Sequence, residues 1–452
     1  MLKKNDDITL EITDITNEGN GVGRYEGAAV FVLYTAVGDV IKCHIVKDNK
    51  SYFYGIIKEM ISPSPHRAEN DCPAYKKCGG CSFRHFSYEE ECRVKQKILS
   101  DAFMRIGGLE PEFESFQGAQ TITGYRNKAQ YPVAEVNGRA VCGFYAKRTH
   151  NVSEYHRCAL QPEIFADIVD DIIEYVNKKG IKAYSEQTHK GLLRHIYLRQ
   201  GAHSGETMLC YVLTDTDKQS SFTEINEYLM NKYPDIKSIV FNENKTTGNK
   251  ILGGKTVTAF GNNNIYDIMS GNKISISPLS FYQVNTYQAE RLYTKAAEYA
   301  EINSDSTLLD LYCGAGTIGL SMAKRIKKLI GVEIIPQAIK NAKYNAALNG
   351  YDNCEFICGD AGKIAKILYD RGERPDVIIA DPARKGCTCD TLEYMKMMSP
   401  DRIVMISCNP ATAARDCAIL AELGYKAVKV TGFDLFPRTT HVECVVLLEK
   451  SV

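Results

Sequence analysis

At 452 residues, with 44% hydrophobic and 24% charged residues, the chain is too long for one ordinary core and suits about three soluble globular domains of ~150 residues. Its 55 basic and 55 acidic residues cancel, so a nucleic-acid partner would need a local basic patch. No apolar run approaches the ~18 residues of a membrane span, and Met1–Asn5 opens no signal-peptide core. We therefore expect a cytoplasmic protein without membrane contact.

The first segment alternates apolar and polar residues from 8 to 60, with glycine-rich turns such as residues 19–23. Short strands at this spacing predict a small β-barrel over residues 1–65, which ends at Ser62-Pro63-Ser64-Pro65.

A cysteine-rich knot follows, in which Cys72-x5-Cys78-x2-Cys81 brings three thiols together through a pair of glycines. Sixteen cysteines in a reducing compartment are better sought as metal ligands or a catalytic thiol than as disulfides. A fourth ligand could be Cys92, Cys142 or Cys158, and the spacing does not decide among them. Four thiolates suit zinc or a four-iron cluster equally well.

A helical pattern runs from about Tyr88 to Ile106, and mixed sequence continues to about 270, with a strand-like run at Gly191–Arg199. Basic and aromatic residues alternate between Lys95 and Arg157, as a surface that binds RNA requires. The basic residues inside this stretch are Arg105, Arg126, Lys128, Arg139, Lys147 and Arg148, and the aromatic ones are Tyr125, Tyr131, Phe144, Tyr145 and Tyr155.

From about residue 286 the pattern changes to repeated strand–helix units, which predicts a Rossmann-like, doubly wound and mostly parallel sheet. The expected strands are 306–311, 328–333, 354–358, 376–380, 402–407, 427–431 and 442–448, and expected helices include 336–348 and 411–423.

The first of these strands runs into the loop Gly314-Ala315-Gly316-Thr317-Ile318-Gly319, and Glu333 ends the next strand, where an acid would bind ribose hydroxyls. This motif suits a dinucleotide or S-adenosylmethionine. Asp310 and Asp381 add carboxylates at strand ends, which would repel a pyrophosphate and attract a sulfonium cation. We therefore favour S-adenosylmethionine over a nicotinamide cofactor.

Cys408 follows another strand, in Ser407-Cys408-Asn409-Pro410, where the acceptor of a methyl group would lie. Uracil C5 is a poor nucleophile, but a thiolate that adds to C6 makes C5 reactive, and a base must then remove the C5 proton. Glu443, on the last strand between apolar residues, is the candidate base, because burial would raise its pKa towards neutrality.

Taken together, these segments resemble the bacterial RNA uracil-C5 methyltransferases, in particular the iron–sulfur branch that acts on 23S ribosomal RNA. The resemblance rests on the barrel, the cysteine knot and the catalytic segments above. It also includes Gly124–Gln130, Gly143-Phe144-Tyr145, Cys158 before Gln161-Pro162, and Ser280–Asn285. Ala383 departs from it, because the family commonly has a second proline there.

The resemblance implies an α/β multidomain fold with three parts. These are a TRAM-like, OB-like RNA-binding barrel at 1–65, a central α+β domain at 66–92 and 125–270, and a class I methyltransferase domain at 93–124 and 271–452. It implies a [4Fe-4S] cluster held by Cys72, Cys78, Cys81 and Cys158, and Cys408 and Glu443 as catalytic residues. S-adenosylmethionine would be contacted by Gln283, Tyr312, Glu333, Asp360 and Asp381.

The expected reaction is thus formation of 5-methyluridine at a single-stranded or loop uridine of 23S ribosomal RNA, by a monomer. A transfer RNA enzyme is the nearest alternative, although we expect such enzymes to lack the barrel and the knot. A noncatalytic RNA-binding assembly factor and an oxidoreductase are further alternatives. The trio of Cys408, Glu443 and Asp381 argues against the former, and the carboxylate-lined crevice against the latter.

Overall fold

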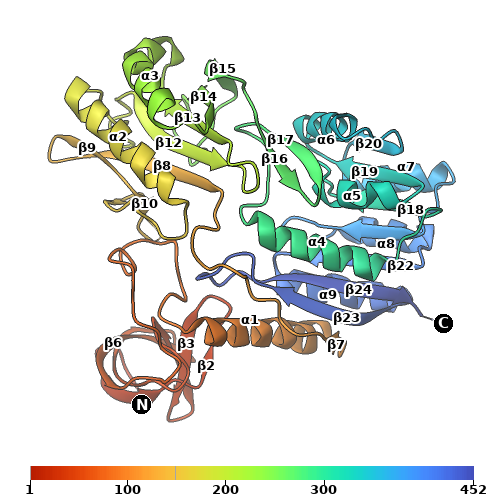
Figure 1. The fold of residues 1–452 in the computed structure, drawn as a ribbon. Coiled ribbons are helices and arrows are strands. Elements are labelled where there is room, and N and C mark those ends of the chain that lie inside the picture. The colour runs from red at the N-terminus through yellow and green to blue at the C-terminus, as the bar shows by residue number, and fades with distance from the viewer. Residues whose placement is uncertain (1, 148, 452) are drawn as a thin grey trace.

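Two six-stranded sheets and one eight-stranded sheet organise the computed structural model, which describes residues 2–147 and 149–451 (Figure 1). Two short two-stranded sheets accompany them. Among the described residues, no helix is both long and apolar enough to cross a membrane.

The N-terminal sheet has the strand order β1-β5-β6-β4-β3-β2, and contacts between β1 and β3 close it into a barrel. Its strands are β1 (Asp7–Glu11), β2 (Asp14–Ile15), β3 (Asn20–Tyr25), β4 (Ala28–Leu33), β5 (Val40–Asp48) and β6 (Tyr52–Ser62). Alternate residues of each strand face a core that includes Leu10, Val30 and Ile41. The predicted barrel is therefore present, with its last strand ending at Ser62.

The glycine-rich segment of the barrel is a strand rather than a turn. A Cβ atom on Gly21 would lie 1.9 Å from Thr35 Oγ1, and one on Gly23 would lie 2.4 Å from the carbonyl oxygen of Glu11. The glycines in β3 therefore allow chain segments to approach closely inside a small barrel.

The central sheet has the order β15-β14-β13-β12-β8-β9. Its strands are β8 (Lys128–Val136), β9 (Arg139–Cys142), β12 (Leu193–Gln200), β13 (Thr207–Leu213), β14 (Ile236–Glu243) and β15 (Lys255–Gly261). Helices α2 (Glu163–Lys179) and α3 (Thr223–Lys232), with a 3-10 helix at Thr216–Phe222, pack on one face around Phe165, Tyr211 and Phe241. The small sheet of β10 (Phe144–Tyr145) and β11 (Val152–Ser153) lies beside β8.

The C-terminal sheet has the order β20-β19-β18-β21-β22-β24-β23-β7. Its strands are β7 (Glu112–Phe113), β18 (Thr307–Leu311), β19 (Lys328–Glu333), β20 (Cys354–Cys358), β21 (Val377–Ala380), β22 (Arg402–Ser407), β23 (Tyr425–Phe433) and β24 (Glu443–Lys450). Strands β18 to β22 pair in parallel, whereas β24 is antiparallel to both β22 and β23.

Separate apolar cores cover the two faces of this sheet. One core includes residues of α4 (Thr286–Ala300), α5 (Thr317–Met322) and α6 (Pro336–Leu348), and a 3-10 turn at Ala323–Arg325 follows α5. The other includes residues of α7 (Ala361–Asp370), α8 (Cys389–Met398) and α9 (Pro410–Glu422). The hairpin of β16 (Ile265–Met269) and β17 (Asn272–Ile276) packs against α6.

Helix α1 (Tyr88–Ala102) and the π-helical turn after it, Phe103–Gly107, lie between the barrel and the C-terminal sheet (Figure 1). Leu99 and Phe103 enter the core that contains α9 and β23. Lys97 Nζ on the same helix lies 3.0 Å from Asp14 Oδ2 of the barrel. This helix therefore contacts both the barrel and the C-terminal sheet with its covering helices.

The basic stretch predicted to bind RNA is only partly available for that role. The side chain of Lys95 has no exposed surface. Its ammonium is 2.8 Å from carboxylate oxygens of both Glu91 and Asp434, so its charge is neutralised within the protein. Arg157 pairs with acidic side chains of α2. Tyr125 and Tyr131 are buried, and Arg148 lies outside the described residues. Only part of the predicted basic stretch from Lys95 to Arg157, including the exposed Arg105 and Arg139, is therefore available to contact RNA.

Candidate active site

Cys408 lies at the turn from β22 into α9. The side chain of Asn409 accepts a hydrogen bond from the backbone N–H of Ala411 at 3.2 Å, and Pro410 begins the helix. Asn409 Nδ2 also donates to the carbonyl of Arg384 at 3.0 Å, which ties this turn to the loop after β21. The cap and the proline thus fix a half-buried thiol at the carboxyl end of a parallel strand.

Glu443 lies beside Cys408 because β22 and β24 run antiparallel and pair Ser407 with Cys444. Its side chain is buried, and burial together with the charge of Asp381 raises its pKa to about 8. Burial, followed by the nearby carboxylates of Glu443 and Asp381, raises the pKa of Cys408 to about 11. The guanidinium of Arg384 lowers the pKa of both groups. The structure therefore brings together the thiol and the carboxyl that the sequence proposed as a pair.

Cys408 opens into a cavity of about 680 Å³ between the barrel and the C-terminal sheet, which we term the barrel groove. The barrel contributes residues 14–18, Val22 and Arg24, and the end of α1 contributes Arg105 and Ile106. Arg384 and residues 440–442 line the opposite side. A polymer in this groove would meet these three arginines and also the acidic side chains of Asp14, Glu18 and Asp101.

Two carboxylates accept hydrogen bonds from the backbone of the glycine loop after β18. The N–H of Gly319 donates to Asp310 Oδ2 at 3.0 Å, and that of Gly314 donates to Glu333 Oε2 at 3.2 Å. Burial raises the pKa of Asp310 to about 8 and that of Asp381 to about 7. Asp310 and Glu333 therefore both support the loop, and Asp381 lies close enough to Asp310 and Glu443 to raise the pKa of each.

The other predicted cofactor residues differ in their surroundings. Tyr312 is the first residue of the loop and has a left-handed φ of 68°. Gln283 approaches the hydroxyl of Tyr293 on α4. Asp360 is exposed and caps α7, where it accepts a hydrogen bond from the N–H of Lys363 at 3.2 Å. A capping role therefore explains Asp360 without a ligand.

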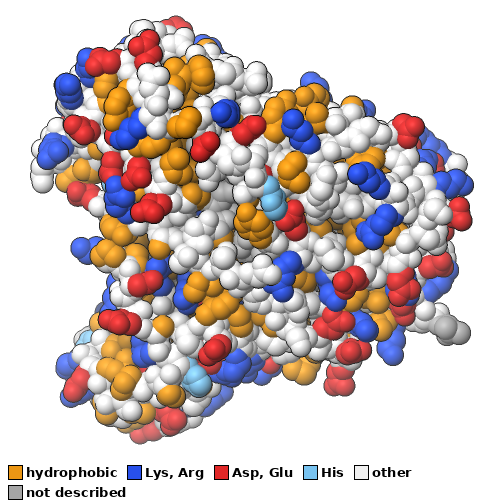
Figure 2. Space-filling model, viewed as in Figure 1, with side chains coloured by type: hydrophobic (Ala, Val, Ile, Leu, Met, Phe, Trp, Pro, Cys, Tyr) orange, Lys and Arg blue, Asp and Glu red, His pale blue; other side chains and the backbone are white. Residues whose placement is uncertain are grey.

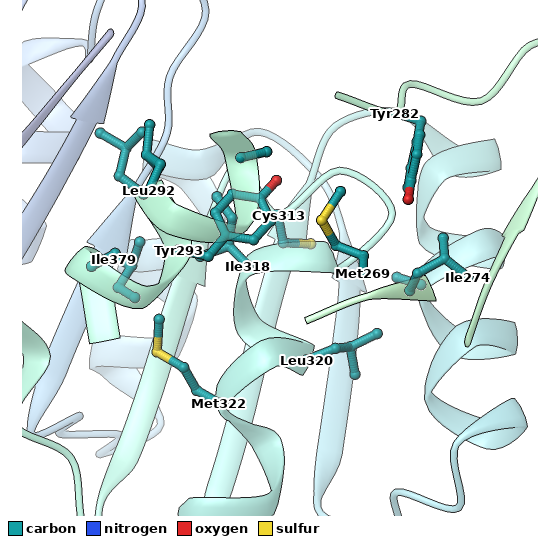
Figure 3. Packing of buried hydrophobic residues seen from close by; sticks show 14 of the residues in the cluster. Met269, Ile274, Tyr282, Leu292, Tyr293, Cys313, Ile318, Leu320, Met322 and Ile379 are labelled. Carbon is teal, nitrogen blue, oxygen red and sulfur yellow. The ribbon is translucent and has the colours of Figure 1, made fainter. Parts of the chain in front are cut away.

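Tyr293 was missed by sequence reasoning. Its hydroxyl lies 3.2 Å from Thr317 Oγ1 of the glycine loop, and Figure 3 shows its ring in the packed layer beside Cys313 and Ile318. Its place in the helical pattern of α4 could have identified it only as a core residue. Cys313 is buried in the same layer, as expected of a packing residue.

The contact between Arg384 and His441 was also missed. Arg384 Nη2 lies 3.1 Å from His441 Nδ1, although 57 positions separate the two residues in the chain. Burial, and then Arg384, lowers the pKa of His441 to about 4, so the imidazole is neutral and can accept a hydrogen bond from the guanidinium. In the sequence, the only indication that these two residues belong to the site was their position in the chain, within three residues of Asp381 and Glu443.

Cys72, Cys78, Cys81 and Cys158 line one cavity of about 50 Å³, which we term the cysteine pocket. Gly79 allows the chain to turn there, since a Cβ atom on it would be 3.0 Å from Lys147 Cα. In the described part of the chain, however, no group of three or more His, Cys, Asp or Glu side chains is placed to hold a metal ion. The structure thus selects Cys158 as the fourth cysteine of the pocket but does not show a metal centre.

Two family models match the chain. Residues 271–451 match the model described as tRNA (Uracil-5-)-methyltransferase, and residues 3–58 match the TRAM domain. The predicted methyltransferase and TRAM domains are therefore confirmed.

Curated relatives span nearly the whole chain. A protein of Clostridium tetani and one of Bacillus cereus, both named uncharacterized RNA methyltransferase, are each 40% identical to it. The alignments cover 99% of this chain, with 97% of the first relative and 98% of the second.

Among solved structures, the Pyrococcus abyssi tRNA (uracil-54, C5)-methyltransferase, in complex with S-adenosyl-L-homocysteine, is similar with a TM-score of 0.78 and 24% identity. The superposition covers 98% of this chain and 100% of that one. A transfer RNA enzyme can thus share the whole fold, so our expectation that such enzymes lack the barrel was wrong.

Proposed function

The chain belongs to the RNA methyltransferases that join a TRAM domain to a uracil-5 methyltransferase domain, and from this premise we propose that it methylates C5 of a uridine in 23S ribosomal RNA. The observation that carries the proposal is the proximity of Cys408, which lines the barrel groove, to the buried carboxyl of Glu443. A thiol beside a buried carboxyl with a raised pKa suits addition to a ring followed by removal of a proton.

S-adenosylmethionine is the methyl donor of this family. In our proposal Glu333 binds its ribose, Asp381 and Gln283 lie towards its charged end, and Tyr312 closes the loop beside it. Asp360 remains a weaker candidate near the adenine, because capping α7 already accounts for it. The two carboxylates around the crevice favour a cationic ligand over a pyrophosphate, which supports this choice.

Cys408 then acts on the uracil ring. Its thiolate adds to C6, and the electron pair of the C5–C6 double bond moves towards C5 and the O4 carbonyl, so that C5 accepts the methyl group. Glu443 removes the C5 proton, the double bond re-forms and the Cys408–C6 bond breaks. Arg384 assists by stabilising both anions, since its charge lowers the pKa of the thiol and of the carboxyl.

We also propose that the cysteine pocket holds a [4Fe-4S] cluster. Four thiols line it, which is the donor set of such clusters, and Arg84 and Arg126 in the same lining would offset the negative charge of the thiolates. A cluster would join residues 72–81 to Cys158 and so fix the chain next to the barrel. Anaerobically purified protein should contain about four irons and absorb broadly in the visible region, while zinc in place of iron would overturn the assignment.

A transfer RNA substrate is the second candidate, since the matching family model and the similar solved structure both carry that description. The deciding experiment maps methylated uridines after the protein is incubated with unmodified 23S ribosomal RNA and, separately, unmodified transfer RNA. We expect 5-methyluridine in the ribosomal RNA only. Cys408→Ala should abolish the product yet bind S-adenosylmethionine as the wild type does, and full activity of that variant would refute the mechanism.

A further inference from the structure

The outer face of the barrel carries three aromatic side chains in mutual contact, Phe31, Tyr52 and Tyr54. Their ring centroids lie 5.7 Å apart for Phe31–Tyr52, 5.6 Å for Phe31–Tyr54 and 5.8 Å for Tyr52–Tyr54. The core of the barrel is built from other side chains, and Tyr52 is 37% exposed. We term these three residues the aromatic face.

The register of the strands shows that the aromatic face is part of a continuous row. Val22 of β3 pairs with Phe31 of β4, Phe31 pairs with Tyr54 of β6, and Tyr54 pairs with Lys47 of β5. The residues that alternate with them, such as Val30, are buried, so the row points outward. Strands about 4.8 Å apart make the row about 14 Å long.

This row begins in the barrel groove. Val22 and Arg24 line the groove together with Cys408. Arg24 pairs with Ala29, and Ala29 pairs with Tyr52, so a second row leads from the groove onto the same face. A chain that leaves the groove past the barrel therefore meets the three rings next.

Charge and exposure at the face suit a nucleic acid. Arg24 stands at the groove end, and Lys47 Nζ lies 5.9 Å from the centre of the Tyr54 ring at the far end. Figure 2 shows hydrophobic side chains exposed on the barrel with charged ones around them. Exposed aromatic rings flanked by cations bind single-stranded nucleic acids through base stacking, which is insensitive to sequence.

We propose that the aromatic face binds about three unpaired nucleotides of the RNA whose target uridine lies at Cys408, by stacking bases on Phe31, Tyr52 and Tyr54. This inference rests on the proposed function for the nature of the ligand. It adds a second binding segment outside the catalytic groove and a requirement for unpaired RNA beside the target.

The chain contains no tryptophan, so a single Tyr54→Trp substitution creates a fluorescent reporter at the face. We expect single-stranded RNA to quench its emission strongly, and duplex RNA of equal length to quench it little. Tyr228→Trp is the matched control, because Tyr228 is an exposed tyrosine beside Lys232 on α3, which packs on the central sheet at the opposite end of the molecule from the barrel (Figure 1). Equal quenching at both positions, or none at position 54 with RNA that the protein binds, would overturn the proposal.

Affinity gives an independent test. Tyr52→Thr/Tyr54→Thr places β-branched residues, which favour strands, at both positions and should weaken binding of single-stranded RNA at least tenfold. Tyr52→Phe/Tyr54→Phe should bind as the wild type does. Unchanged affinity of the threonine variant, with its fold verified by circular dichroism, would rule out stacking at these rings. Neither readout uses catalysis, so a protein that shows both effects without forming 5-methyluridine would refute the proposed function and leave this inference standing.

Discussion

Cys408 and Glu443 both have pKa values above those of the free side chains, although the proposed reaction uses both in their ionised forms. Burial is the main cause for each, and their mutual proximity adds to it for the thiol. Arg384 counteracts the shift from the exposed side. The pair is therefore held mostly protonated until a substrate and a cationic donor change its surroundings.

The first prediction concerns pH. Because Glu443 must be ionised to accept a proton and its pKa is raised to about 8, its ionisation alone should increase kcat/KM about ninefold from pH 6 to pH 7. Arg384→Met removes the charge that lowers this pKa, so its profile should shift to higher pH. Methylation rates at subsaturating RNA would measure both, and a rate that is flat or falls over this range would contradict the assignment.

The second prediction concerns the end of the reaction. Glu443→Gln cannot take up the C5 proton, so the protein should remain bonded to methylated RNA through Cys408. A denaturing gel should show this adduct as a shifted band that carries labelled methyl groups. Cys408→Ala/Glu443→Gln is the control and should show no band, while normal turnover by Glu443→Gln would reject its role as the base.

The sequence was sufficient to identify site residues where a reactive side chain stands at the end of a predicted strand. Cys408 and Glu443 each stand at the end of an apolar run, and parallel or paired strands bring such ends together. The Arg384–His441 contact was not predictable, because it depends on how two loops fold over the same sheet edge. Tyr293 was hidden in a helical apolar pattern, where a core residue and a residue beside a site look alike.

At the scale of elements, α1 attaches to the C-terminal sheet through charges that are fully buried. Lys95 bridges Glu91 and Asp434, and its Nζ lies 3.3 Å from the carbonyl oxygen of Phe436. Arg438, in the same loop, accepts hydrogen bonds at its carbonyl from the N–H groups of Ser82 and Phe83. The loop that leads to Glu443 is thus fixed by α1 and by the segment that follows Cys81.

The third prediction tests this attachment. Lys95→Met would leave two buried carboxylates without their cation, and should lower the free energy of unfolding by about 3–5 kcal/mol. Lys97→Met on the same helix removes an ammonium whose side chain is 40% exposed, and should cost less than about 1 kcal/mol. Urea denaturation of both variants measures the difference, and similar losses in the two would show that the buried network contributes little.

The fourth prediction concerns the glycines of β3. Gly23→Ala places a Cβ atom 2.4 Å from a backbone oxygen, so we expect a loss of about 1–3 kcal/mol. Gly254→Ala has open space around its Cβ and should leave stability unchanged or slightly improved. Thermal unfolding followed by circular dichroism compares the two, and an equally stable Gly23→Ala would show that the barrel can widen.

The strands and helices of the C-terminal sheet were the most predictable elements. The expected ranges 328–333, 354–358, 402–407 and 336–348 coincide with β19, β20, β22 and α6. Their apolar runs are long because both faces of the sheet are covered. Strand β3 was misread because glycine normally marks a turn, and here it reflects contacts with residues distant in sequence.

At the scale of the whole molecule, the net charge is zero, so RNA must be bound by local clusters of basic residues. The barrel groove provides one, with Arg24, Arg105 and Arg384 around the path to Cys408. Arg105 of the basic stretch expected from the sequence belongs to this cluster, whereas Lys95 and Arg157 of that stretch are paired with acidic side chains within the protein.

The fifth prediction follows from this cluster. Three arginine–phosphate contacts with single-stranded RNA should give a slope of about −2 in log association constant against log salt concentration. Arg105→Gln should reduce the magnitude of the slope by about 0.7, whereas Arg139→Gln, exposed on β9, should leave it unchanged. Fluorescence anisotropy at several salt concentrations measures the slopes, and equal effects of the two variants would place the phosphate contacts elsewhere.

The position of α1 between the barrel and the C-terminal sheet also has a consequence for synthesis. The partners of Leu99 and Phe103 on α9 and β23 are translated about 300 residues later, which takes roughly 15–60 s at bacterial rates of elongation. During that interval the barrel can fold, but the apolar side of α1 has no surface to cover it. The nascent chain is therefore most exposed to aggregation, and most in need of chaperones, between the emergence of α1 and that of β24.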